Sequence, residues 1–235
     1  MNQFVGTMPA VYESLYAAGE VAEHAAIAAR RGDKLVHAEL WQSPKGPQLC
    51  VVAEDRPGLL ALVTDALLAQ GLAIQSARAF GRQVSRDRLE AVDLLELRAL
   101  GGADDVAARL DSEGLQAFAR SLSELIADDM AQPASPAKAP LAETGPTTRV
   151  YFERQAPAEG RYLLVVDAPD SDGLMHAVCS ALHSKGMRIM ACEIRTVGSR
   201  ARDRFEVEPS SQRGLSDSAL CDVQLAVLDA LPSRR

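Results

Sequence analysis

The sequence predicts two α+β units of one design, each a four-stranded antiparallel sheet with two helices packed on one face. Shifting the chain by 115 residues superposes Leu49–Ile74 on Leu164–Ile189 without a gap, and 11 of the 26 aligned pairs are identical. Each copy repeats the same succession of apolar strand patterns and helical patterns. Between the copies, Ala131–Thr147 contains four prolines among small residues, a composition that favours an extended tether.

In the first copy, short apolar runs predict strands, and apolar residues at helical spacing predict helices. Pro57 suits the first turn of a helix, where its missing N–H would have no partner, and Gly71 supplies a left-handed cap at the helix end. The expected elements are strands Lys34–Trp41 and Leu49–Ala53, a helix from Leu59 to Leu68, strands Ile74–Phe80 and Leu89–Leu97 joined by a polar turn Gly81–Arg88, and a helix Ser112–Asp129.

The second copy repeats this order. Its expected elements are strands Arg149–Arg154, Tyr162–Asp167, Arg188–Thr196 and Arg202–Val207, with helices Gly173–Ser184 and Ser216–Leu231. Ser216 suits the N-cap of the last helix. An alanine-rich helix, Ser14–Arg31, precedes both copies and is expected to pack against the first. The predicted organisation is a helical lead (1–33), a first unit (34–130), a linker (131–147) and a second unit (148–235).

Composition and charge exclude several function classes. Apolar residues make up 47% of the chain and charged residues 24%, values typical of a globular protein. The formal net charge is -7 and no basic run exceeds two residues, so no nucleic-acid partner is expected. The chain has neither a signal-like start nor an apolar stretch of about 18 residues, so we expect a cytoplasmic protein with no membrane contact.

The usual signatures of catalysis and metal binding are missing from the sequence. The four cysteines form no C-x-x-C pair and are interpreted as small buried residues, and the four histidines form neither H-D nor H-E-x-x-H. Asp170-Ser171-Asp172 has a D-x-D spacing but lies in a turn of the repeat. We therefore expect no catalytic residue, no metal, no cofactor and no enzymatic activity. Asp104-Asp105 and Asp128-Asp129 are interpreted as solvated surface.

Two equivalent turns carry the most specific chemistry. Asp55-Arg56-Pro57-Gly58 and Asp170-Ser171-Asp172-Gly173 each join an apolar strand to a helix. The first N–H groups of a helix lack intrahelical acceptors and carry the positive end of its dipole, so a ligand carboxylate is favoured there. Each turn aspartate could then accept a hydrogen bond from a ligand ammonium group. The same residues also suit an unliganded turn in which the aspartate caps the helix, and the sequence leaves both interpretations open.

Val51–Leu60, with its D-R-P-G-L-L turn, resembles the start of an ACT domain, a small regulatory module that commonly binds amino acids in metabolic enzymes. Ala91-Val92-Asp93 and Ala201-Arg202-Asp203 match the A-x-D that opens the third strand in one subgroup. That subgroup is the carboxy-terminal regulatory region of the bifunctional uridylyltransferase/uridylyl-removing enzyme, which acts on the PII nitrogen-signal protein. The resemblance covers Met8–Leu231 and implies tandem ferredoxin-like (βαββαβ-type) ACT domains without the nucleotidyltransferase and phosphohydrolase signatures of the parent enzymes.

The resemblance implies an amino-acid effector, glutamine-like, held between the helix-start turn of one unit and the second strand of the neighbouring unit. The implied ligand-binding residues are Asp55, Arg56, Pro57, Gly58, Leu59, Leu60, Gln75 and Ser76, with Asp170, Ser171, Asp172, Gly173, Leu174, Met190 and Ala191. We expect the first turn to be the better site. Asp172 places a second negative charge at the second helix start, where it is expected to cap the helix itself and to repel a carboxylate.

Two other functions stay open at this point. The units could form a ligand-free module that assembles a homodimer through sheet edges or helices, because unpaired edge strands invite pairing. Alternatively, the chain could regulate a separately encoded nucleotidyltransferase or contact another nitrogen-signalling protein.

Overall fold

The computed structural model describes residues 2–44, 46–86, 88–100, 106–131, 148–153, 160–210 and 214–231. The expected tether lies outside these residues from position 132 to position 147, as do Asp104 and Asp105. The elements are α1 (Asn2–Val5), α2 (Ala10–Glu13), α3 (Ala18–Arg31), β1 (Val36–Ser43), β2 (Gly46–Glu54), α4 (Leu59–Ala69), β3 (Leu72–Ser85), β4 (Arg88–Ala99), α5 (Val106–Arg109), α6 (Ser112–Ala131), β5 (Arg149–Phe152), β6 (Tyr162–Pro169), α7 (Leu174–Ser184), β7 (Met187–Val197), β8 (Arg200–Pro209) and α8 (Asp217–Ala230). Both copies follow the predicted order of strand, strand, helix, strand, strand and helix.

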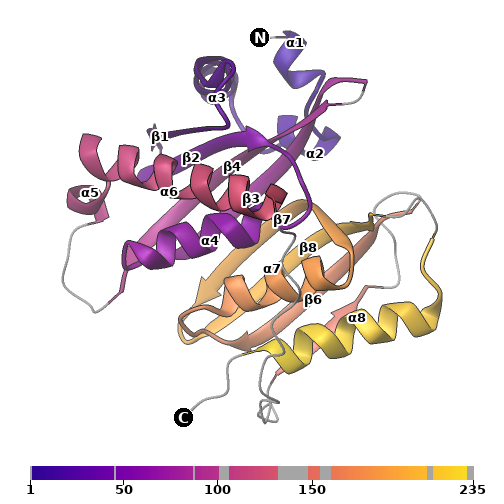
Figure 1. Cartoon of the computed structure of the whole chain (residues 1–235). Coiled ribbons are helices and arrows are strands. Elements are labelled where there is room, and N and C mark those ends of the chain that lie inside the picture. Colours follow the sequence, from indigo (N-terminus) through magenta and orange to yellow (C-terminus); the bar gives the residue numbers. More distant parts are fainter. Residues whose placement is uncertain are drawn as a thin grey trace.

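The strands of both units join in one antiparallel sheet of eight strands, in the order β1-β2-β4-β3-β7-β8-β6-β5 (Figure 1). The junction is the pairing of β3 with β7, which runs from Ser76 opposite Arg195 to Phe80 opposite Ala191. Each unit on its own would leave this strand with unpaired backbone groups. Their mutual pairing within the chain leaves β1 and β5 at the edges of the sheet.

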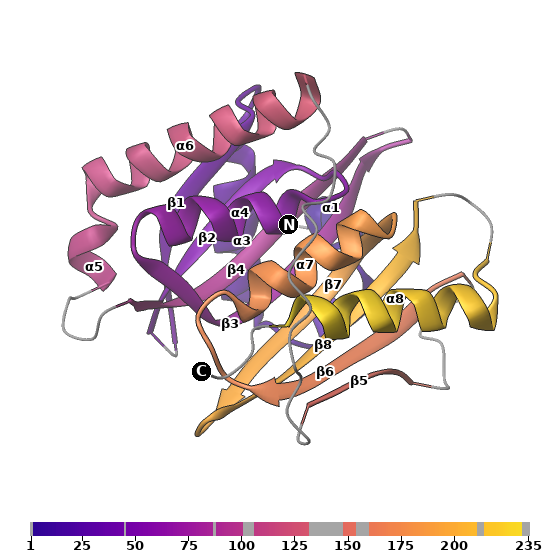
Figure 2. The same cartoon turned by 60° about the horizontal axis from the view of Figure 1, so that its bottom comes forward.

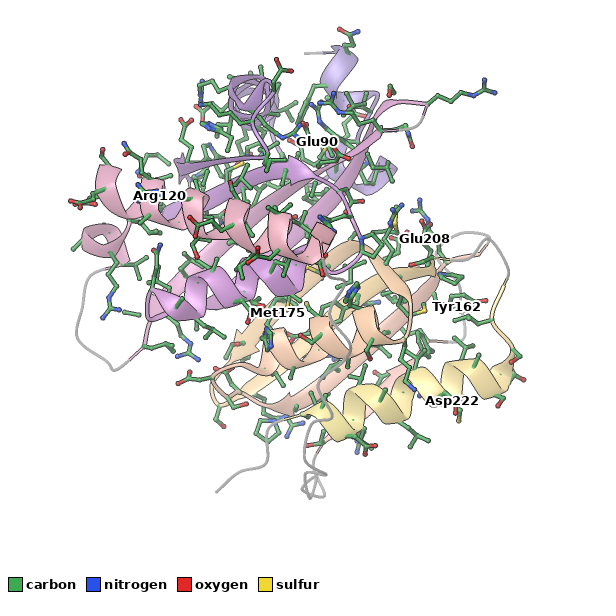
Figure 3. All side chains as sticks on the ribbon, in the orientation of Figure 1. Glu90, Arg120, Tyr162, Met175, Glu208 and Asp222 are labelled. Carbon is green, nitrogen blue, oxygen red and sulfur yellow. The ribbon has the colours of Figure 1, made fainter. Side chains whose placement is uncertain are left out.

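One face of the sheet carries α6, α4, α7 and α8, which lie side by side in that order (Figure 2). Alternate strand residues point toward this layer, as the two-residue period of a strand requires, and they include Leu49, Val51, Leu164 and Val166. α4 of the first unit contacts α7 of the second. The helix layer, like the sheet, is therefore continuous across the two units, and Met175 of α7 lies in this region (Figure 3).

The opposite face of the first unit is covered by α1, α2 and α3 (Figure 1). Phe4, Tyr12 and Ile27 from these helices belong to one buried cluster with Val52 and Phe80 of the sheet. The lead therefore packs against the first unit, as expected from its apolar spacing.

A buried ion-pair network holds this lead to the sheet. Glu90 of β4 is 3% exposed and accepts hydrogen bonds from Arg31 of α3 at 2.8 Å and from Arg82 of β3 at 2.6 Å. Figure 3 places Glu90 below α3. Because both carboxylate oxygens are paired, the charge is tolerated in a nearly dry position.

The corresponding face of the second unit carries ion pairs in place of an apolar cluster. Arg204 binds Glu153 at 3.0 Å, and Arg161 binds Glu206 at 2.6 Å. These side chains are partly exposed, so this face is polar where the first unit's face is apolar and covered by helices.

The structure corrects two element boundaries. β3 and β4 extend to Ser85 and Arg88, so most of the predicted turn Gly81–Arg88 is strand. The backbone ladder does not depend on side-chain polarity, and Arg82 opposite Glu90 adds a cross-strand ion pair. The lead helix begins at Ala18 and not at Ser14, because the Glu20 carboxylate accepts the N–H of Ala17 at 2.8 Å and ends the preceding turn.

Two further predictions concern single residues. Ser216 is the N-cap of α8, as predicted, and its hydroxyl accepts the N–H of Ala219 at 3.3 Å. The interpretation of the cysteines as buried is right for Cys50, Cys179 and Cys192 and wrong for Cys221, which is exposed on α8. Among the described helices, none is both long and apolar enough to cross a membrane.

Candidate ligand sites at the junction of the units

Two small cavities lie where the units meet, and the repeat relates them to each other. The first is bounded by Asp55, Gly58 and Asp93 of the first unit and by Met187 and Ile189 of the second. The second is bounded by Asp170, Gly173 and Asp203 of the second unit and by Ala73 and Ile74 of the first. Each turn therefore faces the start of the strand that follows the first helix of the other unit, β7 for the first turn and β3 for the second.

Each cavity has a volume of about 30 Å³. A single water needs about 10–15 Å³ of such space, so each cavity takes about two waters in this closed arrangement. An amino acid would enter only if the surrounding helices moved apart.

Glycine sets the backbone of both turns. Gly58 (φ +84°) and Gly173 (φ +81°) are the N-cap residues of α4 and α7 in the left-handed conformation, which other residues adopt at a cost. No side-chain cap hydrogen bond is formed at the start of α4 or α7. The interpretation of Asp55 and Asp170 as helix caps is therefore wrong, and the two carboxyl groups face the cavities instead.

The first site contains polar atoms that lack partners. Asp55 Oδ2 and His183 Nδ1 are buried and have no hydrogen bond within the described residues. The His183 ring lies over Gly58, and a Cβ built on Gly58 would be 3.0 Å from its Cγ and Nδ1. Burial raises the pKa of Asp55, while Arg188 from the second unit opposes that rise. Buried polar atoms of this kind lower the stability of the fold unless a ligand or a water molecule forms hydrogen bonds with them.

Asp93 and Asp203 are buried carboxyl groups at equivalent strand positions, 3% and 1% exposed. Burial raises the pKa of Asp93 to about 8, with a further rise from the charge of Asp55. Burial likewise raises the pKa of Asp203 to about 7, and the charge of Asp170 adds to it, although the N–H of Arg195 opposes the rise. These two residues were matched in sequence only as part of A-x-D and were not assigned to the site. Their signal was an acidic residue inside an apolar strand.

Arg56 borders the first cavity, but its guanidinium is engaged outside it. The guanidinium donates to Asp129 at 2.6 Å and to the carbonyl of Ile126 at 3.2 Å, so it holds the C-terminal end of α6. The expected contact of this cation with a ligand carboxylate stays a prediction. Asp129, which is 14% exposed in this pair, is also not the solvated surface residue that the sequence suggested.

The second turn is tied to the first unit by polar contacts. Asp172 accepts from Arg98 at 2.6 Å and is 61% exposed, so it does not cap α7 as expected. His176 Nδ1 lies 3.0 Å from Asp65 Oδ1. These contacts join the second turn and α7 to β4 and α4 of the first unit without a ligand.

The predicted strand residues divide between the two faces of the sheet. Met190 lies near the first site, because its Cε and Asp55 Oδ2 both approach Gly81. Gln75 is exposed. Ser76 and Ala191 line grooves on the opposite face, beside the lead helices. Of the remaining predicted residues, Arg56, Leu59 and Leu60 border the first cavity and Ser171 and Leu174 the second, while Pro57 lies between Arg56 and Gly58 in the first turn.

Two units of this order share one sheet and place the turn of each against the strand that follows the first helix of the other, β7 or β3. This is the tandem ferredoxin-like α+β fold that the resemblance to ACT domains predicts. Within the described part of the chain, no group of three histidine, cysteine or acidic side chains is placed to hold a metal ion.

Comparison with known proteins bears out the resemblance. The bifunctional uridylyltransferase/uridylyl-removing enzyme of Xanthomonas axonopodis pv. citri (strain 306) is 28% identical over 190 residues, covering 77% of this chain and 20% of that enzyme. The enzyme of the same name from Phenylobacterium zucineum (strain HLK1) is 24% identical over 217 residues, covering 90% of this chain and 22% of the enzyme. The chain thus spans about a fifth of the length of these relatives.

Other comparisons are more distant. A crystal structure of aspartate kinase from Synechocystis aligns with a TM-score of 0.39 and 14% identity, over 90% of this chain and 32% of the kinase. No protein-family model matches the chain.

Proposed function

We propose that this chain is a regulatory module without catalytic activity that senses an amino acid, with glutamine the first candidate, at the junction of its two ACT-type units. The observation that carries the proposal is the first cavity, which is lined by Asp55, with its buried and unpaired Oδ2, and by Gly58. The buried and unpaired His183 Nδ1 of the second unit lies against this glycine. The ammonium group of the ligand would donate a hydrogen bond to Asp55 Oδ2. The carboxylate of the ligand would lie at the N-terminal end of α4, whose dipole favours an anion.

The closed cavity links binding to movement. At about 30 Å³ it does not hold an amino acid, so the ligand must separate α4 from the His183 side of α7. The two helices belong to different units, and a change in their separation would be transmitted through both. Binding in this way would shift a population of closed and open junctions, which is what a regulatory module requires.

The similarity to the uridylyltransferase/uridylyl-removing enzymes supports a regulatory role in the same kind of system. We propose that the chain acts on a nitrogen-signalling protein or on a separately encoded enzyme, in the cytoplasm. The amino acid would be the signal and the partner protein the output.

A thermal-shift screen of the twenty amino acids tests the sensor function. A ligand at 100 times its Kd stabilises the folded state by about 2.7 kcal/mol, which raises the unfolding midpoint of a chain of this size by roughly 5–10 °C. The shift should be lost in Asp55→Asn and kept in Asp170→Asn, its repeat-equivalent control. If none of the twenty amino acids shifts the midpoint at millimolar concentration, the sensor function is wrong.

A ligand-free assembly module is the second candidate function. It is favoured by the second turn, where the pairs Asp172–Arg98 and His176–Asp65 join the units without a ligand, and by the small volume of both cavities. In that case β1 or β5 is the natural surface for a homodimer. Analytical ultracentrifugation that shows a dimer, together with a negative amino-acid screen, would favour this function over the sensor.

A further inference from the structure

Asp93 is a carboxyl group without a partner in a closed cavity. It is 3% exposed and lines the first cavity, and within the described residues its side chain accepts no hydrogen bond. A second carboxyl, Asp55, lines the same cavity, acts on Asp93 through its charge and has an unpaired Oδ2. Two such groups cannot both stay ionised in a buried site at low cost, so one of them holds a proton.

The second cavity repeats this arrangement. Asp203 is 1% exposed, lines that cavity and faces Asp170, and its one polar contact is the N–H of Arg195 at 3.4 Å. The same pair of carboxyl groups therefore occurs twice, at positions that the internal repeat relates. A single buried acid could be incidental to packing. Two at equivalent positions, each aimed into the cavity of its unit, point to a shared chemical role.

The groups that face the two acids come from several elements. Asp55 lies in the turn after β2, Cys179 comes from α7 and Cys192 from β7, and the two thiols interact with both Asp93 and Asp203. Cys50 of β2 also interacts with Asp93. The charge of Arg188 and that of Glu208 act on Asp55 with opposite signs. The thiols are neutral, since burial raises the pKa of each. No cation among these groups is in a position to neutralise Asp93 directly.

We propose that Asp93 is a ligand-binding residue, which holds a proton in the unliganded cavity and exchanges it for the ammonium group of the bound effector, and that Asp203 holds a proton at the equivalent position of the second cavity. The ammonium group has about the size of a water molecule, so it fits the space beside the carboxyl, and it supplies the positive charge that the site lacks. The proton leaves to the solvent, and the ammonium–carboxylate pair takes its place. The exchange rests on the proposed amino-acid sensing, whereas the stored proton can be tested without a ligand.

The stored proton predicts a specific dependence of stability on pH. A carboxyl that is protonated more easily in the folded state than in the unfolded chain makes the protein lose stability as the pH rises through the folded pKa. The contribution is lost between the unfolded pKa near 4 and the folded pKa of about 8, so the unfolding midpoint should fall between pH 6 and pH 8 and level off above this range. Asp93→Asn should lose less over this range, because an amide imitates the protonated acid at every pH. Asp203→Asn should behave similarly, and the exposed Asp33→Asn should follow the native protein. Equal pH slopes in the native protein and both buried-site variants would overturn the proposal.

Two measurements separate the stored proton from the exchange. Infrared spectra at pH 7 should show a protonated-carboxyl band that weakens in Asp93→Asn, and its absence from the native protein would refute the stored proton. Titration calorimetry with L-glutamine in phosphate and in Tris at pH 7 should show release of about one proton per bound ligand, with a smaller release in Asp93→Asn. Binding with no proton release would refute the exchange. A lack of glutamine binding, with the pH slope and infrared band as expected, would count against the amino-acid function and leave the stored proton standing.

Discussion

The two glycines at the helix starts offer a matched pair of substitutions. Gly58 and Gly173 have nearly the same backbone, at φ +84° and +81°. They differ in their surroundings, because a Cβ on Gly58 would lie 3.0 Å from the His183 ring, whereas a Cβ on Gly173 would have nothing within 4 Å. Alanine at Gly173 therefore carries backbone strain alone, and alanine at Gly58 carries the same strain and must also displace the ring.

The difference in stability follows from these two contributions. Placing a residue with a Cβ in the left-handed region costs about 1–2 kcal/mol, so Gly173→Ala should lose about that much. Forcing a group into a well-packed contact costs a further 1–3 kcal/mol or so, which gives about 2–5 kcal/mol for Gly58→Ala. The excess of about 1–3 kcal/mol measures how closely the second unit approaches the first turn.

Urea unfolding of both variants measures the excess directly. His183→Ala supplies the control: in that background Gly58→Ala should cost only about as much as Gly173→Ala does in the native chain, about 1–2 kcal/mol. If Gly58→Ala and Gly173→Ala lose equal stability in the native background, the contact between His183 and the first turn does not hold in solution, and the reasoning about the junction fails.

Three further predictions concern residues outside the two cavities or at their border. Glu90→Gln leaves two buried guanidinium groups without their carboxylate, so urea unfolding should show a loss of about 3–5 kcal/mol, and a loss below 1 kcal/mol would contradict the buried network. Burial lowers the pKa of His24 to about 4 from 6.5, so the protein should lose up to about 3 kcal/mol as the pH falls through this window, with full stability above it. The single tryptophan, Trp41, lies 4.2 Å from the His24 ring between centroids, and its fluorescence should report this transition in the native protein and not in His24→Gln. Arg56→Ala should cost about 1–2 kcal/mol and speed hydrogen exchange in the last turns of α6, while unchanged exchange there would show that the pair with Asp129 is not formed.

Much of the fold could be predicted because its determinants are local. Three kinds of signal act within a few residues: the short apolar runs of strands such as β2 and β6, the capping serine of α8 and the glycines at the helix starts. The internal repeat doubles the strand and glycine signals. The extended arms of β3 and β4 could not be predicted from periodicity. Their outer residues are polar, and they pair through the backbone ladder and through Arg82 with Glu90.

The joining of the two sheets also lies beyond local patterns. The pairing of β3 with β7 brings together residues more than 100 positions apart, such as Phe80 and Ala191, and no residue pattern in either strand specifies that partner. The ion pair of Arg56 with Asp129 could not be predicted for the same reason. Asp129 lies on a helix that the sequence does not place beside the first turn.

The turn chemistry could be predicted only in part. Asp55 and Gly58 were identified from the repeat and from the resemblance, and the structure places both at the junction cavity. Asp93 was not, because the burial of a carboxyl is a property of the assembled sheet and helices. A single acid between valine and leucine in a strand is ambiguous in sequence until the face it occupies is known.

Titration calorimetry with L-glutamine, and with any other amino acid that passes the thermal screen, tests the central claim most directly. The native chain should bind the amino acid, Asp55→Asn should lose most of the affinity, and Asp170→Asn should keep it. The second turn and its helix are already tied to the first unit by the pairs Asp172–Arg98 and His176–Asp65. Binding that is lost in Asp170→Asn and kept in Asp55→Asn would place the site at the other turn. Binding that is unchanged in both variants would contradict the account of the junction as the sensing site.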